Sequence, residues 1–164
     1  MTATPILPKE LGQMIEWRRA LHANPEVSGS EFQTRSFILQ QLAQLSIPVQ
    51  TFDSHAGIVA TLEGRAGGGV IALRADMDAL PVNEETGLSY ASKNTGVMHA
   101  CGHDGHMAML LGAAAALQAN RNVWRGTVKL VFQPAEEAAP AGGAPLMIKD
   151  GVLDNPKVDM MFGM

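Results

Sequence analysis

Apolar side chains recur every three or four residues in several stretches of the chain, and this spacing predicts helices. It is clearest in residues 8–23, and it returns in residues 32–45 beyond a break at "NPEVSGS". Residues 105–119 and 144–154 are the other expected helices. The apolar run "MAMLLGAAAALQA" within the third is shorter than the roughly 18–20 residues that cross a bilayer, so we expect a buried helix there.

Polar residues and prolines indicate where these helices begin and end. Ser28 or Ser30 is the expected N-cap of the second helix, and Asp104 is a plausible N-cap of the third. Short polar side chains suit these positions because they accept hydrogen bonds from the free amides of the first turn. Pro48 is expected to end the second helix.

Unbroken apolar runs predict strands that are buried on both faces of a sheet. "VIALRADMDALPV" and "GTVKLVFQPAEE" both begin in this way, and "VDMMFG" starts a further strand. "VQTFDSHAGIVATLEG" reads as strand, turn and strand, and "RAGGG" reads as a turn. Because helices alternate with such strands, the expected fold class is α/β with a mostly parallel sheet.

Composition narrows the class of protein. The chain has 164 residues, 46% of them hydrophobic, which indicates one domain, or one domain and part of another. The net charge is −4 and the basic residues are scattered, so we expect no nucleic-acid partner. The first residues lack a basic start followed by a long apolar run, and a single cysteine fits a reducing compartment, so we expect a cytoplasmic protein without a membrane partner.

Three clusters of chemically active side chains follow predicted strands or open a predicted helix. They are "RADMD", "HACGHD" and "QPAEE". Sites in open α/β sheets lie beyond the carboxyl ends of the strands. We therefore expect the three clusters to meet in one site.

The stretch "MHACGHDGH" holds the only cysteine and three of the five histidines. If it is extended, His99, Cys101 and His103 point to one side, where Cys101 and His103 could bind metal. Two alternatives for Cys101 are a small buried apolar side chain and a nucleophilic thiol activated by a histidine. The neighbouring histidines favour the metal. The role of His99 stays open, and His106 is expected to pack against or orient a ligand.

The two remaining histidines lie far from these clusters in the sequence. His22 and His55 stand alone and are expected at the surface or at a helix end.

The glutamates of "QPAEE" could form a solvated acidic surface, or one could bind metal while the other deprotonates water. Asp76 and Asp78 could both face one side of the chain. Each could cap a turn, or could accept the free N–H of a metal-bound imidazole.

Four segments together resemble the M20 family of metallopeptidases: "RRALHANPEVSGSEFQT", "IALRADMDALPV", "HACGHDGHMAMLLGAA" and "VKLVFQPAEE". The resemblance is strongest to its amidohydrolase branch, which includes hippurate hydrolases, N-acyl-amino-acid amidohydrolases and auxin-conjugate hydrolases. It implies a zinc-peptidase-like, three-layer α/β fold. The implied activity is hydrolysis of the amide bond of an N-acyl amino acid by water activated by two metal ions.

The resemblance also implies a role for each matching residue. Cys101, His103 and Glu137 correspond to metal ligands, and Glu136 corresponds to the general base that activates the water. Asp78, with Asp76 as the second choice, corresponds to the aspartate that orients the ligands. The implied cofactors are two divalent ions, of zinc, manganese or cobalt.

The sequence departs from the family pattern at its end. The family places a further ligand histidine directly after "FG" and one apolar residue, where this sequence ends at "MMFGM". The second domain that covers the site and mediates dimers, and a later ligand histidine, are also missing. We therefore expect residues 1–164 to be the N-terminal part of the catalytic domain of a homo-oligomeric enzyme, incomplete at the C-terminus. The alternative is a non-catalytic metal-binding fragment or interaction module.

Overall fold

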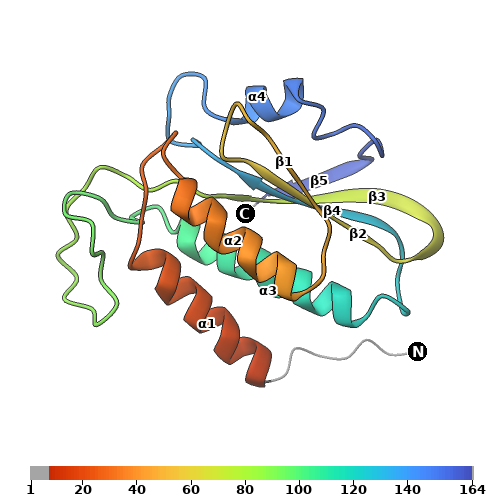
Figure 1. Ribbon diagram of the computed structural model, residues 1–164, viewed down its shortest axis with the longest axis horizontal. Helices are drawn as coiled ribbons and strands as arrows, with labels where there is room; N and C mark the ends of the chain where they lie inside the picture. Colours follow the sequence, from red (N-terminus) through yellow and green to blue (C-terminus); the bar gives the residue numbers. More distant parts are fainter. Residues whose placement is uncertain (1–7, 164) are drawn as a thin grey trace.

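The computed structural model describes residues 8–163 as one sheet with helices on both faces (Figure 1). Residues 1–7, part of the segment in which no signal peptide is expected, and Met164 lie outside the described residues. The elements in chain order are α1 (Pro8–His22), α2 (Phe32–Gln44), β1 (Val49–Thr51), β2 (Ile58–Glu63), β3 (Arg65–Asp76), α3 (His103–Ala119), β4 (Arg125–Gln133), α4 (Ala144–Lys149) and β5 (Met160–Gly163).

The sheet has the strand order β1-β2-β4-β3-β5. β3 is parallel to both of its neighbours, β4 and β5, whereas β2 is antiparallel to both β1 and β4. The expectation of a mostly parallel sheet therefore holds only in part, and the sheet is mixed. β2 is reversed because a short turn joins it to β1, and such turns join antiparallel strands.

The helices form the outer two of three layers, as expected. Figure 1 shows α1, α2 and α3 on one face of the sheet and α4 on the other. Leu130 and Phe132 of β4 lie in the larger core with α1–α3, and Val131 between them lies in the smaller core with Met147 of α4. Alternate side chains of β4 thus fill both cores, which explains why its sequence is an unbroken apolar run.

The segment "RAGGG" is part of β3, so the prediction of a turn there is wrong. Pairing with β4 shifts register between Arg65 and Val70, and Gly67 and Gly68 have positive φ of 82° and 102°. Glycine adopts such angles without a steric penalty, so the strand bulges here and remains paired.

The predicted caps of α2 are also wrong. α2 begins at Phe32, and the side chain of Glu26 accepts hydrogen bonds from its early amides, from Gln33 N at 3.1 Å and Thr34 N at 2.8 Å. Neither Ser28 nor Ser30 caps the helix. A carboxylate six positions before the first residue of the helix replaces the local serine, and short-range sequence patterns do not reveal this.

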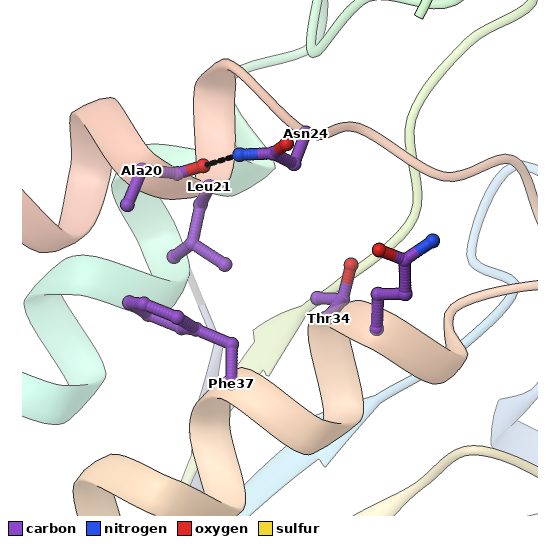
Figure 2. A pocket seen from close by; sticks show the side chains of 6 residues that line it. Ala20, Leu21, Asn24, Thr34 and Phe37 are labelled. Carbon is purple, nitrogen blue, oxygen red and sulfur yellow. Dashed lines mark hydrogen bonds between the residues drawn. The ribbon is translucent and has the colours of Figure 1, made fainter.

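The last turn of α1 packs against the first turns of α2 around a small pocket (Figure 2). The side-chain amide of Asn24 donates to the carbonyl of Ala20 at 2.8 Å and closes the end of α1. Leu21 and Phe37 extend toward each other between the two helices. Amides, one hydroxyl and apolar groups line this pocket, so it lacks the titratable groups of a catalytic site.

α3 begins two residues earlier than expected, with Gly102 at the N-cap position and a φ of +87°. Asp104 lies within the first turn and is fully buried, so the N-cap prediction for it is wrong. Its carboxylate instead pairs with His22 at 2.9 Å and with Arg18 at 3.1 Å. His22 is the last residue of α1, as one of its two expected settings allowed, but it is buried.

α4 is shorter than the sequence predicts. α4 ends at Lys149, earlier than the expected 154, because Gly151 with a φ of +79° turns the chain away. Within residues 8–163, no helix combines the length and apolar character needed to cross a membrane.

Candidate metal centre

The carboxyl ends of β3 and β4 lie side by side, because the two strands are parallel and Asp76 pairs with Gln133. "RADMD" and "QPAEE" therefore leave the sheet at the same edge. His103, the first residue of α3, reaches this edge from the helix layer. The three clusters meet in one place, as predicted from the order of elements.

His103 lies at the centre and is 3% exposed. Its Nδ1 donates a hydrogen bond of 2.8 Å to the backbone carbonyl of Asp78, which leaves the lone pair on Nε2. Nε2 lies 3.9 Å from the nearest oxygen of both Glu136 and Glu137, and 3.5 Å from Asp76 Oδ2. The ring thus presents an acceptor nitrogen to a group of carboxylates.

The side chains of Cys101, His103 and Glu137 fit a divalent cation. One ligand atom from each lies within 4.8 Å of the others. Glu137 Oε1 is buried, and no hydrogen-bond donor among the described residues reaches it. Thiolate sulfur, imidazole nitrogen and carboxylate oxygen are ligands that zinc and other first-row metals accept.

The neighbours of Cys101 change the pKa of its thiol. Interaction with the carboxylate of Glu137, and then partial desolvation, raise the pKa of Cys101 above its ordinary value. The thiol is therefore protonated at neutral pH, and a cation beside it would reverse this preference. A raised pKa argues against a free nucleophilic thiol at this position.

The buried carboxylate of Asp78 accepts hydrogen bonds from several residues of the site. Its Oδ1 accepts from the backbone amide of Glu136 at 3.0 Å, and its Oδ2 accepts from the amide of Glu137 at 2.8 Å and from the hydroxyl of Ser28 at 2.6 Å. Burial raises the pKa of Asp78, but hydrogen bonds from His103, Ser28 and the two amides hold it well below its usual range. The carboxylate is ionised and fixes both the turn and the imidazole.

Glu136 differs from Glu137 in its surroundings. Its side chain is 41% exposed, whereas its backbone amide is held by Asp78. A carboxylate with a fixed backbone and an open side chain can exchange protons with a molecule in the site.

Asp76 belongs to a second group of possible ligands, with His103 and His106. Its Oδ1 accepts from His106 Nδ1 at 2.7 Å, and its Oδ2 accepts from Arg74 Nη1 at 2.6 Å. His106 therefore contacts the site through its hydrogen bond to the carboxylate of Asp76.

His99 does not join the ligands. Residues 99–102 form a turn, closed by a hydrogen bond from Gly102 N to the carbonyl of His99 at 3.4 Å, so the extended conformation considered for this stretch is not present. The His99 ring is buried, and neither of its nitrogens has a hydrogen-bond partner among the described residues. Burial lowers the pKa of His99 to about 4, so the ring is neutral at pH 7.

His55 lies apart from this group. It pairs with Asp150 at 3.2 Å, and its side chain is 5% exposed, so it is not the surface histidine that was expected.

Sequence reasoning missed three residues that contact the site. Ser28 donates to Asp78, Arg74 donates to Asp76, and Glu31 accepts from the backbone amide of Ala135 at 2.6 Å. Arg74 has a local signal, since residues two apart in a strand share a face. Ser28 and Glu31 are distant in sequence from their partners and have none.

Comparison with known proteins places this geometry in a family. Residues 72–164 match the family described as peptidase family M20/M25/M40. The chain belongs to this family. It is 48% identical over 152 residues to N-acetyl-L-cysteine deacetylase of Bacillus subtilis, covering 93% of this chain and 36% of that protein. It is also 48% identical over 155 residues to N-acyl-L-amino acid amidohydrolase of Geobacillus stearothermophilus, covering 92% of this chain and 40% of that protein.

The fold agrees with an M20 family structure. The chain matches the crystal structure of the Bacillus subtilis YXEP protein, described as a dinuclear metal binding peptidase from the M20 family, with a TM-score of 0.89 and 43% identity. That match covers 95% of this chain and 43% of the other. The present chain thus spans well under half the length of each of these three relatives.

Proposed function

We propose that the full-length protein hydrolyses the amide bond of N-acyl amino acids. The observation that supports this best is the cluster of Cys101, His103 and Glu137 beside the open carboxylate of Glu136. Two similar proteins are named as a deacetylase of N-acetyl-L-cysteine and an amidohydrolase of N-acyl-L-amino acids. Both names describe cleavage of an acyl group from the nitrogen of an amino acid.

Cys101, His103 and Glu137 are the proposed metal ligands. The proposed cofactors are two divalent ions per complete site, of zinc, manganese or cobalt, and the similar Bacillus subtilis structure is described as dinuclear. Such ions, when bound, polarise a substrate carbonyl and lower the pKa of water toward neutrality. His103 is prepared for this role because Asp78 already holds the proton of Nδ1.

Glu136 is the proposed general base. Its Oε2 takes a proton from the attacking water as the water oxygen bonds to the amide carbon, and then gives that proton to the leaving amine nitrogen. The C–N bond breaks as the amine is protonated, so the products are a carboxylic acid and a free amino acid. The backbone bond to Asp78 holds Glu136 in place, while exposure of its side chain allows access to substrate.

Asp78 is proposed as the residue that orients the ligands, in preference to Asp76. Asp78 contacts His103 through its carbonyl and both glutamates through its carboxylate. Asp76 is instead paired with Arg74 and His106. One residue therefore sets the position of a ligand, of the base and of a second ligand together.

We further propose that residues 1–164 are the N-terminal part of the catalytic domain of a longer protein. That protein would act as a cytoplasmic homo-oligomer on a small-molecule substrate. For a polypeptide of these residues alone, we propose metal binding without turnover, because both groups of possible ligands found among the described residues share His103 and so do not form two independent metal sites.

The decisive experiment uses the full-length protein and a hippurate-like N-acyl amino acid. We expect hydrolysis to stop after chelation of metal and to return when zinc, manganese or cobalt is added. Glu136→Gln, refolded and reloaded in parallel, controls for contaminating hydrolase. Hydrolysis that survives complete removal of metal would refute the proposal.

A further inference from the structure

Three consecutive backbone amides follow β4, and each donates to a buried carboxylate. The amide of Ala135 donates to Glu31 Oε1 at 2.6 Å, and those of Glu136 and Glu137 donate to Asp78 at 3.0 and 2.8 Å. Asp78 is part of the cluster "RADMD" and contacts the site directly. Glu31 lies in the segment "NPEVSGSE", more than a hundred positions away in the sequence.

We propose that Glu31 is a positioning residue that fixes the turn of residues 134–137, which carries the base and a metal ligand. This inference rests on the proposed function for the roles of Glu136 and Glu137. It adds that the segment before α2 is a structural part of the site.

The turn needs an external restraint because of its backbone. Ala135 has a φ of +52°, in the left-handed region that residues with a Cβ atom seldom adopt. Its carbonyl accepts a hydrogen bond from the amide of Gly143 at 3.0 Å, and a Cβ atom at Gly143 would lie 2.0 Å from the carbonyl oxygen of Pro134. Ala135 is therefore held on one side by Glu31 and on the other by a glycine that has room for no side chain.

Glu31 has no comparable role in its own helix. It precedes α2 without making a side-chain cap, and the amides of Gln33 and Thr34 go to Glu26. It is 0% exposed, and burial raises its pKa above the ordinary value. A carboxyl group in such a place costs free energy unless its hydrogen bonds are used, and the amide of Ala135 is the partner it meets outside its own segment.

Loss of this contact frees the residue directly before the base. Ala135 can then relax from its left-handed angle, and the carboxylate of Glu136 moves relative to the substrate. Misplacement of a catalytic group by about 1 Å lowers turnover by as much as roughly 100-fold. Binding of substrate depends less on this carboxylate, so the main effect is on kcat.

The test uses three variants of the full-length, metal-loaded protein. Glu31→Met keeps the length of the side chain and removes its oxygens, whereas Glu31→Gln keeps an acceptor for the amide of Ala135. Glu26→Gln is the matched control, because Glu26 is a carboxylate of the same segment that serves α2. Hydrogen exchange of peptides covering residues 133–138 is measured with kcat, KM and metal content.

We expect Glu31→Met to speed exchange in residues 133–138 and to lower kcat by about 10- to 100-fold with little change in KM. Glu31→Gln should stay within about threefold of the wild type in kcat, since the hydrogen bond to the amide persists. Glu26→Gln should change exchange in α2 and leave the turn unchanged.

Unchanged exchange at residues 133–138 in Glu31→Met would overturn the proposal. So would an increase of exchange spread evenly over the sheet, because that result describes a general loss of stability. If the wild type fails to hydrolyse N-acyl amino acids, the proposed function fails, whereas hydrogen exchange still tests whether Glu31 holds the turn.

Discussion

At the scale of single residues, the two ring nitrogens of His103 have different roles. One ring nitrogen is committed to the carbonyl of Asp78, and the other faces the carboxylates. With Cys101 and Glu137, His103 forms a group that offers one sulfur, one nitrogen and one oxygen ligand atom. A ligand set of this kind predicts that each residue contributes to metal affinity and only little to stability.

Cys101→Ser in the full-length protein should lower metal affinity or occupancy, because a thiolate ligand is replaced by a weaker hydroxyl. Cys101 is exposed, so thermal unfolding of the metal-free protein should change little. Elemental analysis after dialysis against a range of free zinc concentrations measures the effect. An unchanged content of two ions per chain would exclude Cys101 as a ligand.

Glu137→Gln and Glu136→Gln should separate the two glutamates. Glu137→Gln should weaken metal binding, since a neutral amide is a poorer ligand. Glu136→Gln should retain metal and lower kcat by about 10²–10⁴-fold, the usual contribution of a general base. Metal titration and steady-state kinetics on the same samples distinguish them. If both variants lose metal equally and recover normal turnover at high metal, the assigned roles are wrong.

At the scale of elements, the junction of α1 and α3 places His103. Asp104, the next residue, is buried and pairs with His22 and Arg18 of α1. His22 also pairs with Glu84 at 3.1 Å, which ties the long segment after β3 to the same point. The position of the first turn of α3 thus depends on contacts that lie outside the site.

Asp104→Ala should lower the free energy of unfolding by about 3 kcal/mol, because it leaves the buried Nδ1 of His22 without its partner. Asp53→Ala is the matched control, since Asp53 is exposed, and its effect should stay within about 0.5 kcal/mol. Urea unfolding followed by circular dichroism measures both. Equal midpoints for the two variants would show that the junction does not hold α3.

The elements that could be predicted from sequence are those with a strong local pattern. The helices at 8–23 and 105–119 and the buried run of β4 follow from spacing alone, and the meeting of three clusters follows from the rule on strand ends. The antiparallel pairing of β2 with β4 and the bulge at "RAGGG" depend on which strands become neighbours in the sheet, and spacing does not encode this. Glu31 was missed for the same reason, because its partner is distant in sequence.

At the scale of the whole molecule, the two groups of possible ligands among the described residues share one imidazole, that of His103. A two-metal clamp on a tetrahedral intermediate needs more, and such electrostatic stabilisation is usually the largest catalytic contribution. We therefore expect a purified polypeptide of these 164 residues to bind metal weakly and to show no measurable turnover of N-acyl amino acids. Robust hydrolysis, after full-length enzyme is excluded by mass spectrometry, would contradict this.

The same polypeptide should self-associate through β5, which forms one edge of the sheet. Met160 and Phe162 are 62% and 55% exposed, and an apolar edge strand offers both unpaired backbone groups and apolar surface to a second copy. Phe162→Lys should shift sedimentation toward the monomer, because a charged side chain on an edge strand opposes pairing. Leu11→Lys is the control, since Leu11 is equally exposed on α1, away from the edge. If both variants sediment like the parent chain over a tenfold range of concentration, β5 is not the contact.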